Sequence, residues 1–86
     1  MLFDFDTIQA PDHGFWMWRT NIPLDIAFLD DSGVVVRVLG MEVCGARAES
    51  CPSYAPGVAY SSALETNLGW FRENGMEEGD RVTVVR

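Results

Sequence analysis

The stretch FWMWRTNIPLDIAFLDDSGVVVRVL, residues 15–39, decides the fold, because it predicts two strands joined by a tight turn. Residues 24–29 are apolar except for one aspartate, and residues 34–39 are rich in valine, which suits a pleated, half-buried surface. The polar residues 30–33 separate the two runs, and Gly33 provides the positive φ that a tight reversal needs. This arrangement predicts a β-hairpin.

The first five residues of this stretch are rich in aromatic side chains and predict a short strand at the start of the hairpin. Their side chains alternate between two faces, with Phe15 and Met17 on one and Trp16 and Trp18 on the other. One pair is expected in the core and the other on an exposed ledge, on which Arg19 can stack. The alternative, in which both tryptophans are packed, stays open. An exposed ledge would favour contact with a carbohydrate, a peptide or a protein.

Residues 1–8 predict a further half-buried strand, because phenylalanines alternate there with Asp4 and Asp6. We interpret the two aspartates as the solvent face of that strand rather than as a metal pair. Residues 10–14 predict a loop that carries His13, the single histidine, as a surface residue. Pro23 cannot donate to a strand ladder, so the residues just before it predict a bend.

The second half of the chain predicts two strands and one helix. Residues 58–65 and residues 81–85 have strand character. Residues 68–74 fit two helical turns that carry Trp70, with Asn67 as the N-cap and Gly75 in the left-handed position after the last turn. The fold class that follows is mainly β, with antiparallel strands and one short helix near the C-terminus.

Cys44 and Cys51 lie in the least regular stretch, residues 40–57, with six residues between them. This spacing favours a local disulfide, and two free thiols are the main alternative. A zinc site is disfavoured, because there is no second cysteine pair and His13 is far away in the sequence. An oxidised pair would indicate an extracytoplasmic location or an assembled particle.

Size and charge set the broad class of the protein. A chain of 86 residues makes a single domain, residues 1–86, whose small core is marginal without a cross-link or a partner. The formal charge is −7 and there is no lysine, which argues against binding to nucleic acid or to an anionic membrane surface. No apolar run is long enough for a transmembrane segment, and the first residues do not resemble a signal peptide.

Asp25 interrupts an otherwise apolar strand, so it is either exposed or buried with hydrogen-bond partners. A third interpretation makes it a catalytic acid or base, with Arg19, Glu65 or Asp80 as helpers. No motif typical of a nucleophile, a phosphate loop, a metal site or a cofactor is present. We therefore expect no cofactor and no enzymatic activity.

The motifs FWM…T.IPLDIAFLD.SGVVV, CPSY and LE.N.GWF..NG…GDRV together resemble the DUF192 family of uncharacterised domains over nearly the whole chain. The resemblance implies a small antiparallel β-sandwich or jelly-roll-like domain. Many members carry secretion signals, which suits a Cys44–Cys51 bridge. Members have Lys and Asn at the positions of Trp18 and Arg19, and their domain begins further upstream. The resemblance therefore implies a shortened version that lacks strands.

Missing strands would leave an open sheet edge or an apolar face, which another chain can cover. The expected function is a structural or interaction module that self-associates or docks on a protein partner. One form would be an accessory or decorating protein of a larger shell, such as a virion. The alternative is a domain that binds a small ligand, either a carbohydrate or an envelope component. For either function, the sequence offers these candidate contact residues: Trp16, Trp18, Arg19, Tyr54 and Trp70.

Overall fold

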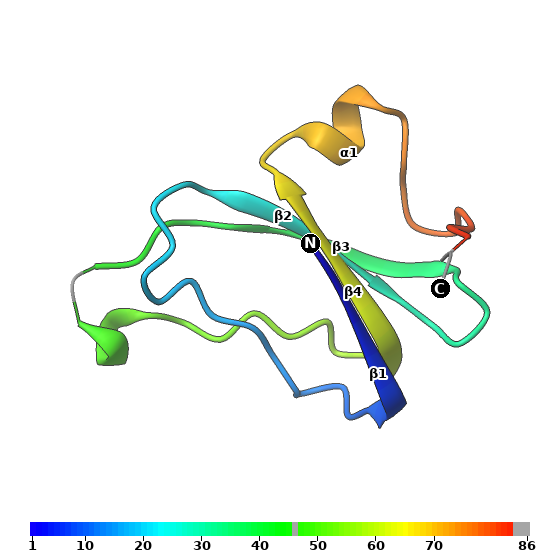
Figure 1. Cartoon of the computed structure of the whole chain (residues 1–86), viewed down its shortest axis with the longest axis horizontal. Helices are drawn as coiled ribbons and strands as arrows, with labels where there is room; N and C mark the ends of the chain where they lie inside the picture. The colour runs from blue at the N-terminus through cyan, green and yellow to red at the C-terminus, as the bar shows by residue number, and fades with distance from the viewer. Residues whose placement is uncertain (46, 84–86) are drawn as a thin grey trace.

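A computed structural model describes residues 1–45 and 47–83 of the chain, which form one four-stranded antiparallel sheet with a short helix (Figure 1). The strands lie in the order β1-β4-β2-β3. The predicted mainly β, antiparallel fold with one short α-helix near the C-terminus is confirmed. The elements are β1 (Leu2–Gln9), β2 (Leu24–Leu29), β3 (Val35–Met41), the 3₁₀ turn η1 (Ala48–Ser50), β4 (Tyr60–Asn67) and α1 (Trp70–Glu73).

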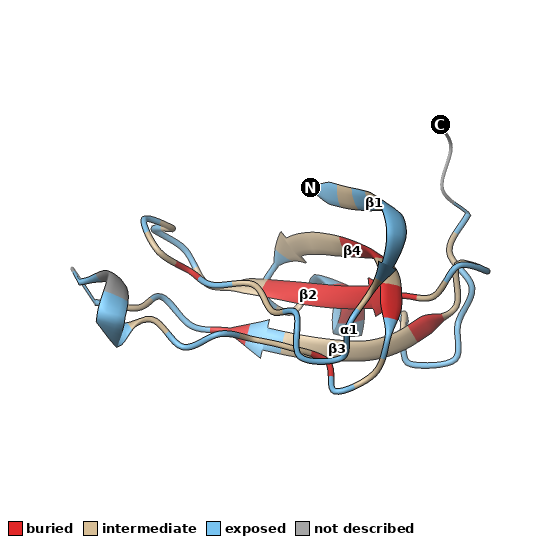
Figure 2. Cartoon of the chain, turned by 90° about the horizontal axis from the view of Figure 1, so that it is seen from below, coloured by how far each residue is buried: buried red, intermediate tan, exposed pale blue. Residues whose placement is uncertain are grey.

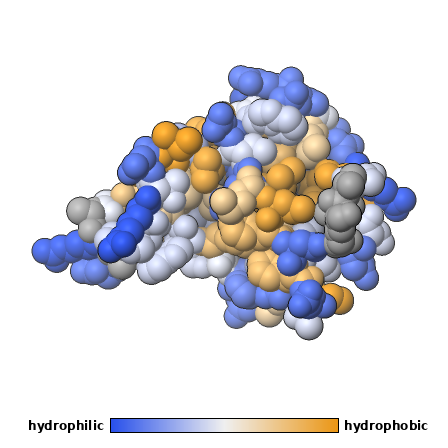
Figure 3. All heavy atoms as spheres, in the orientation of Figure 1, coloured by the Kyte–Doolittle hydropathy of each residue, from blue (hydrophilic) through white to orange (hydrophobic). Residues whose placement is uncertain are grey.

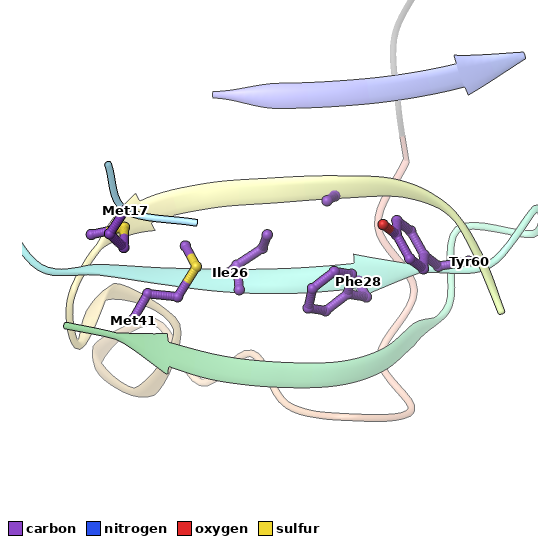
Figure 4. Close-up of a cluster of buried hydrophobic side chains, with 6 residues drawn as sticks. Met17, Ile26, Phe28, Met41 and Tyr60 are labelled. Atoms are coloured by element: carbon purple, nitrogen blue, oxygen red, sulfur yellow. The ribbon is translucent and has the colours of Figure 1, made fainter. Parts of the chain in front are cut away.

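Strand β2 is the centre of the molecule, because it pairs with β3 on one side and with β4 on the other (Figure 2). Successive side chains of a strand point to opposite faces of the sheet, so β2 contributes to two clusters. Ile26 and Phe28 belong to the first cluster, which Figure 4 shows together with Met17, Met41 and Tyr60. The second cluster lies on the other face and comprises Ala27, Leu29, Val35 and Phe71.

The predicted hairpin is confirmed as β2, a polar turn and β3. The Asp30 side chain organises the turn, since its Oδ1 accepts the backbone N–H groups of Ser32 at 2.8 Å and Val34 at 3.0 Å. Gly33 has a φ of 81°, as expected for the position of the reversal. Glycine is required there for a second reason, because a Cβ at this position would lie 2.3 Å from the carbonyl oxygen of Val82.

The aromatic residues 15–19 are not a strand of this hairpin, and here the sequence prediction was wrong. Phe15 makes only an isolated bridge with Tyr54, and Arg19 turns the chain with a φ of 63°. The predicted bend before Pro23 then separates this segment from β2. Residues 15–17 instead cross the first cluster as a cover, which leaves Met17 only 1% exposed.

The helix is shorter than predicted, and Asn67 is not its N-cap. Strand β4 continues through Asn67, which pairs with Leu24 of β2 and is therefore held in the ladder. The helix begins only at Trp70, after Gly69 reverses the chain with a φ of 89°. The predicted left-handed residue after the helix is confirmed, since Gly75 has a φ of 67°.

The predicted strand over residues 81–85 is a single bridge in the described part of the chain. Arg81 pairs with Val34, and the Val82 N–H donates to the Gly33 carbonyl at 2.7 Å. The pairing is short because this segment lies beside only the turn end of the hairpin, at Gly33 and Val34. Val84 and Val85 lie outside the described residues.

Strand β1 pairs with β4 and with no other strand of the described chain. As predicted, its phenylalanines are half-buried, while Asp4 and Asp6 are exposed. The predicted loop of residues 10–14 is also found, and His13 is exposed there. β1 is the most exposed of the four strands, and like β3 it lies at an edge of the sheet (Figure 2).

Candidate functional site

Two loop segments, residues 15–23 and 42–54, extend from one end of the sheet, on the left of Figure 1. We call them the arm, and within it the structure describes every residue except 46. Phe15 and Tyr54 join the segments by two backbone hydrogen bonds, of 2.9 and 2.7 Å. Cys44 and Cys51 form a disulfide with a Cα–Cα distance of 5.1 Å. The structure therefore has the predicted local disulfide rather than two free thiols. The bridge joins the two segments of the arm, and the disulfide closes a loop within the second.

The arm carries the aromatic ledge that the alternation suggested. Trp16 is 54% exposed, and its ring centroid lies 6.4 Å from that of Trp18 at an interplanar angle of 40°. The guanidinium carbon of Arg19 lies 5.4 Å from the centroid of the Trp18 ring, which is within cation–π range. Phe15 and Met17 point to the first cluster instead. The ledge is therefore a surface feature supported by buried neighbours.

A hollow of about 320 Å³ lies beside the ledge, between the two segments of the arm. Trp18, Val43 and the disulfide residue Cys44 give it apolar walls, and Arg19 places a positive charge at its edge. Two more apolar side chains of the arm are open to solvent, since Ile22 is 53% and Val43 46% exposed. Ile22 and Val43 were missed by sequence reasoning, because an isolated branched residue in a loop carries no periodic signal.

The other two aromatic candidates do not join the ledge. Tyr54 packs against the first cluster, and its hydroxyl accepts the backbone N–H of Glu42 at 3.2 Å. Trp70 lies on α1, where its ring is 5.5 Å from that of Phe71. Because Phe71 belongs to the second cluster, Trp70 lies on the opposite side of the sheet from residues 15–17. Of the five candidates, only Trp16, Trp18 and Arg19 therefore form one surface.

Asp25 is buried, with 9% of its surface exposed, and its Oδ2 accepts the backbone N–H of Gly69 at 2.9 Å. The carboxylate thus holds the turn between β4 and α1 against β2. The three residues considered as its helpers lie elsewhere. Arg19 is on the arm, Glu65 faces the first-cluster side of the sheet, and Asp80 Oδ2 accepts the N–H of Glu77 at 2.9 Å.

The burial of the Glu65 carboxyl group can be tested through the pH dependence of stability. Burial raises the pKa of its carboxyl group, and the nearby N-terminal amine opposes that shift. The folded state therefore binds the proton more tightly than the unfolded state, so stability falls as pH rises from the unfolded pKa through the folded one. Glu65→Gln is expected to raise the melting temperature at pH 7, and the gain should vanish below about pH 4, where Glu65 is protonated in both states. Melting curves at pH 3.5 and 7 check this, and a Gln variant less stable at pH 7 would contradict it.

Residues 1–45 and 47–83 contain no group of three or more His, Cys, Asp or Glu side chains placed to hold a metal ion. None of the helices in those ranges is both long enough and apolar enough to span a membrane.

Comparison with known proteins gives a family match. The model of the DUF192 family, described as "Uncharacterized ACR", matches residues 1–84. No curated protein matches the chain, and no solved structure matches it.

Proposed function

The chain belongs to the DUF192 family, and we propose that it is a non-enzymatic interaction module that uses the arm to associate with a second copy of itself. In this role it serves as a subunit of a larger assembly. The observation that carries the proposal is the exposure of Trp16, Ile22 and Val43 on the arm, whose two segments are joined by the Phe15–Tyr54 bridge and whose second segment is closed by the disulfide.

The residue types of the arm suit a protein contact. Tryptophan and arginine are over-represented among the residues that contribute most to binding between proteins, and apolar neighbours exclude water from them. The arm offers Trp16, Trp18 and Arg19 in that arrangement, with Ile22 and Val43 close by in the same two segments. The disulfide lowers the entropy cost of binding for the second segment, because it restricts the loop next to Val43 before contact.

The charge of the arm permits contact with a second copy. The arm contains two arginines, Arg19 and Arg47, and two glutamates, Glu42 and Glu49, so its net charge is zero. The whole formal charge of −7 therefore resides in the rest of the chain. The remainder of each copy is acidic, so two copies repel each other there, and contact between their neutral arms keeps the acidic parts apart.

Matched substitutions at two exposed isoleucines test the proposal. We expect light scattering to give twice the 9.6 kDa chain mass at micromolar concentration and above. Ile22→Asp places a charge on the arm and should weaken the association about tenfold or more. Ile8→Asp places the same charge on β1, where the native side chain is 65% exposed, and should leave the association unchanged. A folded wild-type monomer at every concentration, or equal effects of the two variants, would rule the proposal out.

A second function, binding of a carbohydrate, is favoured by one specific observation. The ring of Trp16 is more than half exposed, and an open indole face can stack on a sugar ring. Titration of the monomeric Ile22→Asp variant with oligosaccharides, followed by tryptophan fluorescence, separates the two functions. A saturable change that Trp16→Ala abolishes would favour the carbohydrate function, and an unchanged spectrum would count against it.

A further inference from the structure

A larger hollow, of about 620 Å³, lies on the other side of the sheet from the arm residues 15–17. It is bounded by β3, by α1 and by the turn that follows the helix. Its apolar lining comprises Val38, Phe71 and Met76, which also pack with the second cluster. Figure 3 shows hydrophobic atoms exposed near the middle of the molecular face, below α1, with hydrophilic residues around them. This volume is in the range of pockets that take small organic ligands.

Asp25 lines the same pocket, although more than nine-tenths of its surface is buried. The alternation of β2 places it on the face of the second cluster, between apolar neighbours. Its Oδ2 accepts the Gly69 N–H, whereas its Oδ1 accepts no hydrogen bond from the described residues. No fully buried side-chain oxygen of the described chain lacks a partner, so Oδ1 is reached by solvent, near Gly40, and Asp25 is one of the residues that line the pocket.

The remaining charges of the lining are mostly negative. Glu77 and Glu78 lie at the rim with Arg72. Together with Asp25, the lining therefore contains three carboxylates and one guanidinium group. Glu78 also accepts the backbone N–H of Val38 at 3.4 Å, which ties the rim to the edge strand β3. A pocket with apolar walls and a half-satisfied carboxylate inside is complementary to a cation attached to an apolar stem.

We propose that this pocket binds a primary ammonium or guanidinium group on an aliphatic stem, with Asp25 Oδ1 as the partner of the cation. The stem lies against Val38, Phe71 and Met76, and the cation takes the acceptor position that the protein leaves open. This site is separate from the arm, so it does not depend on the proposed self-association.

The probe experiment uses the ¹⁵N-labelled full chain and amide chemical shifts. Hexylamine and agmatine are expected to give saturable shifts at Gly69, Phe71 and Met76, and the indole signal of Trp16 should stay in place. Hexanol, which has the same stem as hexylamine without the charge, should bind about tenfold more weakly or not at all. Equal binding of hexanol, or shifts confined to the arm, would overturn the proposal.

A blocked arginine, N-acetyl-arginine amide, distinguishes the source of the cation. Binding of agmatine alone would assign the pocket to free amines, and equal binding of the blocked arginine would assign it to side chains of a protein. Both outcomes support a cation site, whereas failure of hexylamine, agmatine and blocked arginine alike would refute it.

Three substitutions locate the charge that binds. Asp25→Asn keeps an oxygen for the Gly69 N–H and is expected to weaken hexylamine binding about tenfold or more. Glu77→Gln at the exposed rim should weaken it about twofold, and Glu73→Gln, an exposed helix residue outside the pocket, should not change it. Unchanged binding by a folded Asp25→Asn protein would overturn the proposal. If the Asp25→Asn variant does not fold, equal hexylamine binding by the Glu77→Gln and Glu73→Gln proteins would overturn the proposal.

Discussion

Replacement of Phe28 by alanine is expected to lower the free energy of unfolding by about 3–5 kcal/mol. Phe28 is fully buried in the central strand β2 and belongs to the first cluster. Its ring lies 4.8 Å from the Tyr60 ring in an edge-on arrangement and 5.9 Å from the Phe15 ring. Alanine would leave a cavity among all these contacts and loosen the cover that Phe15 provides. For a domain of this size, the loss is a large part of its total stability.

Urea denaturation followed by circular dichroism measures this loss. Ile8→Ala is the control, because Ile8 is 65% exposed on β1 and its truncation should change stability by less than about 0.5 kcal/mol. A loss below about 1 kcal/mol for Phe28→Ala would contradict the central position of β2 between two apolar clusters.

Removal of the Cys44–Cys51 cross-link is expected to cost about 2–3 kcal/mol of stability. The two cysteines are seven positions apart, and the bridge lowers the entropy of the unfolded chain by closing this short loop. In the folded protein, the bridge also restricts the arm segment that carries Val43, so its loss should weaken the proposed self-association. The expected result is a less stable protein that needs a higher concentration to form the same complex.

The double variant Cys44→Ala/Cys51→Ala, compared with the wild type under oxidising conditions, measures both effects. The wild type in excess dithiothreitol is the matched control, because it loses the bridge without a change of sequence. The reduced wild type and the double variant should agree in unfolding midpoint and in solution mass. A reduced protein as stable as the oxidised one would show that the bridge does not constrain the arm.

The features predicted correctly from the sequence depend on residues that are close in the chain. The hairpin of β2 and β3 follows from two apolar runs and from a turn in which Asp30 and Gly33 have distinct local tasks. The alternation in β1 and the left-handed Gly75 are signals of the same kind. The cysteine spacing made a local disulfide the favoured pairing for the same reason.

The wrong predictions concern the ends of elements, where two possible partners compete. Asn67 has the chemistry of an N-cap, yet its pairing with Leu24 keeps it in β4. The aromatic residues 15–19 have strand propensity, yet burial of Met17 over the first cluster requires them to cross the sheet rather than to extend the hairpin. Contacts with distant residues outweigh local propensity in both cases: strand pairing does so for Asn67, and for residues 15–19 burial of an apolar side chain contributes more than a single strand pair.

The sequence by itself therefore determined the four strands of the sheet, the hairpin turn, the favoured cross-link and the composition of the aromatic ledge, although it also predicted a strand over residues 15–19. Only the tertiary structure decided which of these features meet. It placed the Asp25 carboxylate against Gly69, 44 positions away, and it put Trp70 on the opposite side of the sheet from Trp16. The physical reason is that strand order and the burial of both faces of β2 depend on contacts between distant residues. The free energy of such contacts depends on the whole packed core, and no local pattern in the chain records it.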